Sequence, residues 1–133
     1  MSLILIIDDE APLRLLFQEV FIQAGYETVA VAGGREGLQW FARAAVDLVI
    51  LDLFMPEMDG IECIREIRRK HPRTKIVAIS GGLPGGGVDL LHVAKLLGAD
   101  RALAKPFPHT ELLAAVREEL GASAPRPVAY QGE

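Results

Sequence analysis

A short apolar run that ends in an aspartate places the strongest constraint on how this chain folds. Leu48–Leu51 is rich in Leu, Val and Ile and is too short for a buried helix, so we predict a fully buried parallel strand. Pro56 and Gly60 then break the strand and open a helix. Asp52 is therefore predicted to stand at the carboxyl end of a central strand, where open α/β sheets place their ligands.

The rest of the chain alternates short apolar runs with amphipathic segments. Further strands are predicted over residues 3–7, 27–32, 75–79 and 101–104. Helices are predicted from Pro12 to Gly25, from about Leu38 to Ala45, over 59–70 and 88–97, and from about Leu112 to Leu120. This alternation predicts an α/β fold with a doubly wound, five-stranded parallel sheet. A flavodoxin-like (βα)5 fold with strand order 2-1-3-4-5 fits it, and would bring Asp8 and Asp9 beside Asp52.

Length and composition limit the class of protein. The chain has 133 residues, half of them hydrophobic, so we expect one domain over residues 1–120 and a disordered tail over 121–133. A net charge of −4 gives no basic surface for nucleic acid and no polybasic membrane patch. The single Cys63 allows no internal disulfide, and the apolar amino terminus reaches Asp8 too early for a signal peptide. We therefore expect a cytoplasmic protein with no direct contact to nucleic acid or membrane.

Four of the predicted strands end in residues suited to phosphate chemistry, namely Asp8-Asp9, Asp52, Ser80 and Lys105. Clustered carboxylates repel each other, and Mg²⁺ removes that conflict because it binds carboxylate, carbonyl and phosphate oxygens. An ammonium group and a hydroxyl both suit phosphoryl oxygens. The set predicts a site that makes and holds an acyl phosphate on a carboxylate.

The chain resembles a receiver domain of the response-regulator family of two-component signalling, similar to the chemotaxis regulators. The resemblance covers about residues 3–120. It rests on Asp8-Asp9, Asp52 in Asp-x-x-Met-Pro-x-Met-Asp-Gly, Ser80, Gly98-Ala99-Asp100 and Lys105-Pro106-Phe107.

The resemblance implies that Asp52 accepts a phosphoryl group from a histidine kinase or a histidine phosphotransfer protein. It implies that Asp9, Asp52 and the backbone carbonyl of Phe54 bind Mg²⁺, with Asp8 assisting through water. Ser80 and Lys105 would hold the phosphoryl oxygens, and Lys105–Pro106 would be a cis peptide.

Two features depart from the family pattern. Ala102 stands where the family carries a Tyr or Phe whose ring moves inward on activation, so the usual aromatic switch is missing. Gly81 opens a glycine-rich segment that we expect to be mobile, to become ordered on phosphorylation and to carry the output. The family resemblance also points to the surface of residues 88–120 as the place for an output partner or a weak homodimer.

We expect a phosphorylation-controlled switch that assists only its own phosphorylation and dephosphorylation. Because residues 121–133 are too few to fold, we expect it to act alone or within a relay. The alternative, favoured by Ala102, is a receiver-like interaction module that works without phosphate. A Mg²⁺-dependent phosphohydrolase would want an Asp-x-Asp pair, but Leu53-Phe54 follow Asp52. A flavin binder would need a phosphate loop where this chain places Asp8-Asp9.

Overall fold

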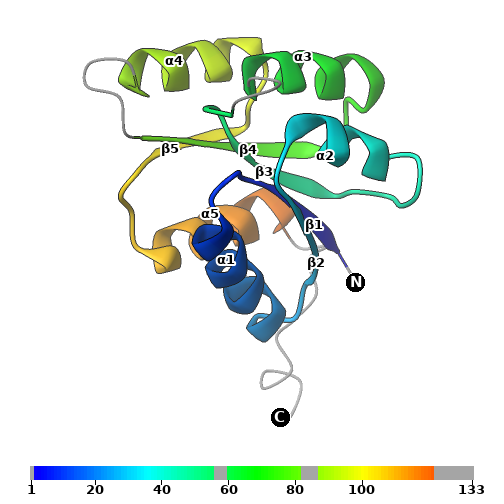
Figure 1. The fold of residues 1–133 in the computed structure, drawn as a ribbon, viewed down its shortest axis with the longest axis vertical. Coiled ribbons are helices and arrows are strands. Elements are labelled where there is room, and N and C mark those ends of the chain that lie inside the picture. Colours follow the sequence, from blue (N-terminus) through cyan, green and yellow to red (C-terminus); the bar gives the residue numbers. More distant parts are fainter. Residues whose placement is uncertain (1, 56–59, 82–86, 122–133) are drawn as a thin grey trace.

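The computed structural model describes residues 2–55, 60–81 and 87–121, and in this part the chain forms one parallel sheet flanked by helices (Figure 1). The strands are β1 (Leu3–Ile7), β2 (Glu27–Val31), β3 (Leu48–Asp52), β4 (Lys75–Ser80) and β5 (Arg101–Ala104). The helices are α1 (Ala11–Gln23), α2 (Gly34–Trp40), α3 (Gly60–Lys70), α4 (Gly87–Leu97) and α5 (His109–Leu120). The sheet order is β2-β1-β3-β4-β5, which confirms the predicted doubly wound, flavodoxin-like fold.

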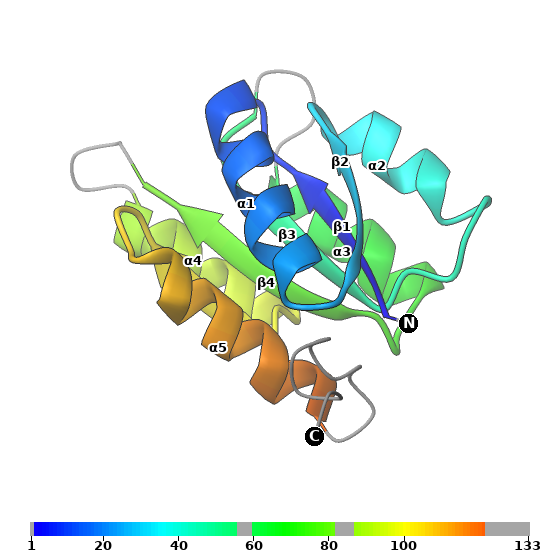
Figure 2. The same ribbon diagram turned by 90° about the horizontal axis from the view of Figure 1, so that it is seen from below.

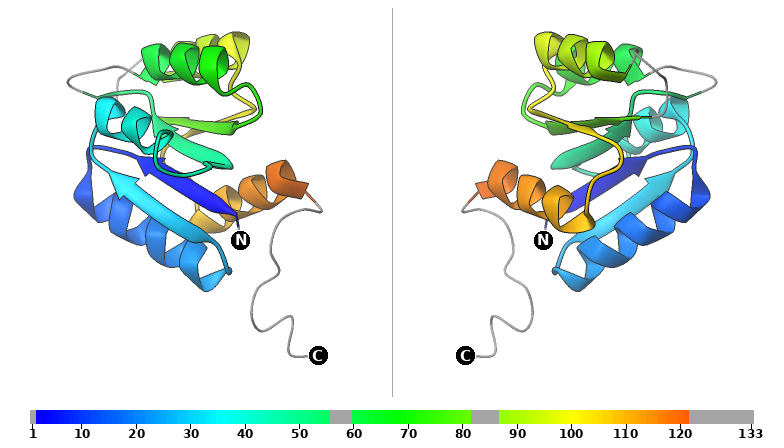
Figure 3. Two further views of the ribbon diagram at one scale, coloured as in Figure 1. Left: turned by 90° about the vertical axis from the view of Figure 1, so that its right-hand side faces the viewer. Right: turned by 90° about the vertical axis from the view of Figure 1, so that its left-hand side faces the viewer.

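The helices cover the two faces of the sheet unequally. Helices α1 and α5 lie on one face and α2, α3 and α4 on the other, as Figures 2 and 3 show from two directions. Successive strand residues point to opposite faces, so each central strand feeds both cores. In β1, Ile4 and Ile6 pack with Phe17 of α1, while Leu5 and Ile7 pack toward α2 and α3. Burial on both faces explains why these strands are apolar without alternation.

Several element boundaries differ from the prediction, and the largest difference is at the end of α2. Helix α2 ends at Trp40 rather than near Ala45, because the N–H groups of residues 41, 42 and 43 bond to carbonyls three residues back instead of four. This tighter hydrogen bonding ends the α-helix and starts a turn. Strand β4 continues through Ser80, one residue beyond the predicted end.

An arginine joins three segments at the amino edge of the sheet, that is, the side on which the parallel strands begin. Arg68 of α3 donates from Nε to the carbonyl oxygen of Gly98 at 2.9 Å and from Nη1 to the carbonyl oxygen of Thr74 at 2.7 Å. Its Nη2 donates to Oδ2 of Asp100 at 2.8 Å, and the same oxygen accepts the N–H of Ile76 at 2.8 Å. The guanidinium thereby fixes α3 against the segments that lead into β4 and β5, at the edge opposite Asp52.

At the carboxyl edge, the start of α3 lies close to the end of β3. A Cβ at Gly60 would collide with the Cα of Leu53 and would lie 2.8 Å from the carbonyl oxygen of Asp52, so glycine permits this approach. Residues 56–59, most of the glycine-rich segment (82–86) and the residues from 122 onward lie outside the described part of the chain. No helix in the described ranges has both the length and the apolar composition needed to cross a membrane.

Candidate functional site

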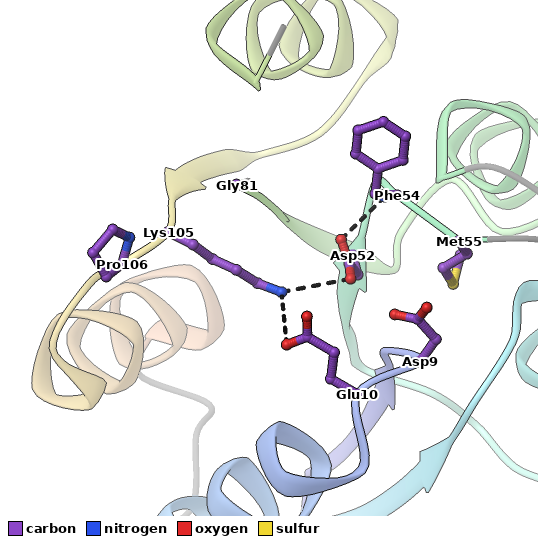
Figure 4. Close-up of a pocket in the computed structure, with 8 residues that line it drawn as sticks. All are labelled: Asp9, Glu10, Asp52, Phe54, Met55, Gly81, Lys105 and Pro106. Carbon is purple, nitrogen blue, oxygen red and sulfur yellow. Dashed lines mark hydrogen bonds and ion pairs between the residues drawn. The ribbon is translucent and has the colours of Figure 1, made fainter. Parts of the chain in front are cut away.

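The carboxyl ends of the strands surround a cavity of about 620 Å³ (Figure 4). Its lining consists of Asp9, Glu10, Asp52, Phe54, Met55, Gly81, Lys105 and Pro106. The sheet order explains this grouping, since β1 lies beside β3 and β4 lies beside β5. Figure 4 shows Lys105 reaching toward Asp52 from the β5 side, while Asp9 and Glu10 approach from the end of β1. The structure therefore brings the predicted residues to one edge of the sheet.

Three carboxylates form a compact group. One oxygen from each of Asp8, Asp9 and Asp52 lies within 4.8 Å of the others. Asp8 is fully buried and Asp52 is 3 % exposed, whereas Asp9 is exposed. Oδ1 of Asp8 accepts the N–H of Glu10 at 2.8 Å, and Oδ1 of Asp52 accepts the N–H of Phe54 at 3.0 Å. Each buried acid is thus oriented through one oxygen by a backbone N–H.

The ammonium group of Lys105 is shared among carboxylates. Its Nζ lies 3.5 Å from Oδ2 of Asp8, 3.5 Å from Oδ2 of Asp52 and 3.8 Å from Oε1 of Glu10. All three distances exceed that of an ordinary N⁺–H···O⁻ hydrogen bond. The ammonium is therefore attracted to several anions without being tightly bound to one.

The backbone around Lys105 is tightly placed. The N–H of Lys105 donates to the carbonyl oxygen of Ser80 at 2.7 Å. A Cβ at Gly81 would collide with the Cβ of Lys105, so the two residues lie in close contact. The predicted cis peptide between Lys105 and Pro106 is confirmed. Lys105 is thus held against the end of β4 while its ammonium remains in the cavity.

Burial and mutual repulsion govern the charge of the site. The pKa of Asp52 is raised to about 6, and burial is the largest cause. The negative charges of Asp8 and Asp9 also raise this pKa, while the Phe54 N–H and the Lys105 ammonium lower it. Burial also raises the pKa of Asp8, against the Glu10 N–H and Lys105. For Lys105, burial alone would lower the pKa, but the carboxylates of Asp52, Asp8 and Glu10 outweigh it and raise the pKa. One ammonium therefore faces an excess of carboxylates.

Two buried oxygens in this region have no hydrogen-bond partner among the described residues: Oδ2 of Asp8 and Oγ of Ser80. Buried polar atoms normally have partners, so such atoms call for a ligand or a functional reason. Three clustered carboxylates, one of them with an oxygen that accepts no hydrogen bond from the described residues, match the hard oxygen ligands that Mg²⁺ prefers. The residues present therefore fit a Mg²⁺ ion, and the Ser80 hydroxyl remains available to an oxygen of a bound group.

The predicted residues do not all reach the cavity surface. Asp9, Asp52, Phe54, Gly81, Lys105 and Pro106 line it, whereas Asp8 and Ser80 are fully buried and Ala102 lies further back on β5. Ala102 pairs with Ala78, which packs toward α3 and α4, so Ala102 faces that same side of the sheet. From the sequence, Glu10 is only the third residue of an acidic run with no predicted role, yet in the structure its carboxylate lies 3.8 Å from the Lys105 ammonium. Its only sequence signal was its position directly after Asp8-Asp9.

Comparisons with known proteins agree with this geometry. Residues 4–117 match the family described as the Response regulator receiver domain. Sporulation initiation phosphotransferase F of Bacillus subtilis is 35% identical over 117 residues, which cover 88% of this chain and 92% of that protein. Chemotaxis protein CheY of Thermotoga maritima is 33% identical over 116 residues, covering 86% and 94%. The response regulator TrrA of Thermotoga maritima, solved in complex with Mg(2+)-BeF, is 35% identical with a TM-score of 0.78 and coverage of 90% and 100%.

Proposed function

Because this chain belongs to the response regulator receiver domain family of two-component signalling, we propose that Asp52 accepts a phosphoryl group from a phosphohistidine and thereby switches partner binding. The donor would be a histidine kinase or a histidine phosphotransfer protein. The observation that carries the proposal is the placement of Asp52, a nearly buried carboxylate within 3.5 Å of the Lys105 ammonium at the edge of a cavity.

The chain's own residues supply most of the chemistry. With a pKa of about 6, Asp52 is mainly ionised at neutral pH and can act as a nucleophile. In the proposed transfer, a bond forms between phosphorus and a carboxylate oxygen as the bond to the histidine nitrogen breaks. The electron pair stays on the imidazole, which then takes a proton. The Phe54 N–H orients the carboxylate through Oδ1, and Lys105 lies against Oδ2 to neutralise charge.

Asp8, Asp9 and Asp52, with the Phe54 carbonyl, would hold Mg²⁺ in this scheme, as the acid cluster supports. When bound, the ion supplies electrostatic stabilisation to the phosphoryl oxygens. Ser80 would donate its hydroxyl to a phosphoryl oxygen, because its Oγ has no competing partner among the described residues. The chain would act only on its own phosphorylation and dephosphorylation.

We place the output surface on α4, β5 and α5. Val93 and Leu96 of α4 are large apolar residues with 38% and 73% of their surface exposed, which suits contact with a partner or a second copy. Ala102 favours a second candidate function, an interaction module that works without phosphate. The complete set of Asp9, Asp52 and Lys105 around the cavity supports the phosphorylated switch over this alternative.

The experiment that tests the proposal is intact-mass spectrometry after incubation with acetyl phosphate, with Mg²⁺ or with a chelator. The wild type, Asp52→Asn and the control Asp47→Asn, which changes an exposed aspartate before β3 at the opposite edge, are compared. One Mg²⁺-dependent phosphoryl adduct, absent only from Asp52→Asn, is expected. An adduct that persists in Asp52→Asn would exclude Asp52 as the acceptor. No wild-type adduct with acetyl phosphate or with a phosphorylated histidine phosphotransfer protein would favour the second candidate.

A further inference from the structure

Glu10 lies at the cavity but has no part in the chemistry described so far. Its N–H donates to Oδ1 of Asp8 at 2.8 Å, and its carbonyl oxygen accepts the N–H groups of Leu13 and Arg14, each at 3.1 Å. The backbone of Glu10 is thus fixed at the start of α1. Its side chain is 57% exposed and extends over the cavity toward Lys105 (Figure 4).

Lys105 has two kinds of carboxylate partner. Asp8 and Asp52 are buried partners at 3.5 Å, whereas Glu10 is a solvent-exposed partner at 3.8 Å. A phosphoryl group that arrives at Asp52 must attract Lys105 away from these anions. Glu10 opposes that step twice, because it competes for the ammonium and adds negative charge to the wall that the phosphoryl anion passes.

We propose that Glu10 is a positioning residue that retains Lys105 in the resting site and selects against small anionic phosphodonors. This inference rests on the proposed phosphorylation of Asp52. A protein donor gains binding free energy from contacts outside the cavity, and this offsets the repulsion by Glu10. A small acyl phosphate has no such contacts, so the repulsion by Glu10 lowers its affinity for the site without compensation.

The size of the effect follows from the exposure of Glu10. A unit charge a few ångströms from a phosphoryl group in water-like surroundings changes an equilibrium constant by about threefold to tenfold. Salt screens interactions between exposed charges, so this factor should fall toward one at high ionic strength. A purely structural effect of replacing Glu10 would not depend on salt in this way.

The test uses Glu10→Gln, Glu10→Asp and the control Glu27→Gln, which removes one exposed carboxylate at the opposite edge of the sheet. The first readout is the Mg²⁺-dependent affinity for fluoroberyllate, measured by ¹⁹F NMR titration. The second is the initial rate of adduct formation with acetyl phosphate, measured by intact mass at low and high salt. Circular dichroism verifies that each variant is folded.

We expect Glu10→Gln to raise both the affinity and the rate by about threefold to tenfold at low salt, with a smaller gain at high salt. Glu10→Asp, which keeps the charge, should stay closer to the wild type, and Glu27→Gln should match it. Wild-type phosphorylation on Asp52 with no gain in Glu10→Gln would overturn this inference and leave the proposed function intact. A gain that is independent of salt, or equal in Glu27→Gln, would also overturn it. A wild type that takes neither a phosphoryl group nor fluoroberyllate would refute the proposed function and, with it, this inference.

Discussion

Replacing Asp52 by Asn should stabilise the folded protein when no divalent cation is present. The carboxylate is 3 % exposed and lies among other acids, so its ionised form is less favourable in the folded chain than in the unfolded chain. Asparagine has nearly the same shape, and its side-chain oxygen can still accept the Phe54 N–H. The substitution therefore removes the unfavourable charge and retains the hydrogen bond.

The pKa shift of Asp52 sets the size of this stability gain and the direction in which the gain changes with pH. The pKa rises from 3.8 to about 6 on folding, and this difference corresponds to about 3 kcal/mol. Below pH 3.8 the carboxyl is protonated in both states and no penalty exists. Between pH 3.8 and about 6 the unfolded state loses its proton before the folded state does, so wild-type stability falls across this range and levels off above it. The advantage of Asp52→Asn should thus be about 3 kcal/mol at pH 7.5, about 1.5 kcal/mol at pH 5 and close to zero at lower pH.

The assay is urea denaturation of the wild type and Asp52→Asn in chelator, repeated across this pH range. At pH 7.5 the gain should appear as a free energy of unfolding higher by about 3 kcal/mol, and a thermal melt of the same samples should show a melting temperature higher by about 10 °C. Glu27→Gln, which removes an exposed acid, serves as the control and should show no comparable trend. An Asp52→Asn protein no more stable than the wild type at pH 7.5, or an advantage that does not shrink toward pH 5, would refute the reasoning.

Three further predictions concern the metal, the buried hydroxyl and the arginine at the amino edge. Millimolar Mg²⁺ should raise the melting temperature of the wild type by mass action but raise that of Asp52→Asn much less, as differential scanning fluorimetry would detect. Ser80→Ala should change the free energy of unfolding by less than about 1 kcal/mol, because its Oγ has no partner among the described residues, yet lower Mg²⁺-dependent fluoroberyllate affinity in a ¹⁹F NMR titration. Arg68→Met should lower the free energy of unfolding by about 3 kcal/mol in urea, because Asp100 loses its cationic partner and the carbonyl oxygens of Gly98 and Thr74 lose their donor. The control Arg69→Met, which breaks a surface pair, should cost less than about 1 kcal/mol, and equal losses would contradict this account.

The sequence predicted most of the fold because its strands are bounded by clear changes in polarity. The bounds of β1 and β5 agree with the prediction, since each is a short run between polar residues or glycine. The predicted end of α2 near Ala45 was wrong, because the apolar spacing of the sequence continues through Phe41 into the turn that follows the helix. Periodicity reports which side chains face the core, but it does not report where backbone hydrogen bonds shorten from four residues to three.

The site was predictable where it depends on strand ends and less so where it depends on side-chain reach. Asp9, Asp52 and Lys105 converge because parallel strands align their carboxyl ends. The contact between Glu10 and Lys105 depends on a side chain that crosses the cavity from another strand, and no local pattern encodes this. Arg68 was likewise not singled out, because its acceptors are mainly backbone carbonyls from other segments.

Because residue 102 has no aromatic ring, the backbone contacts between β4 and β5 are the route by which we expect the proposed signal to pass. Ala102 faces the α4 side of the sheet with a side chain too small to rotate into or out of a pocket. The backbone of Lys105, by contrast, donates to the Ser80 carbonyl at 2.7 Å, and its Cβ lies against Gly81. Movement of Lys105 toward a phosphoryl group would therefore displace the end of β4 through a direct hydrogen bond and a steric contact. Because Ser80 also pairs with Ala104 of β5, this displacement would reach β5, which is part of the proposed output surface, without any change in residue 102.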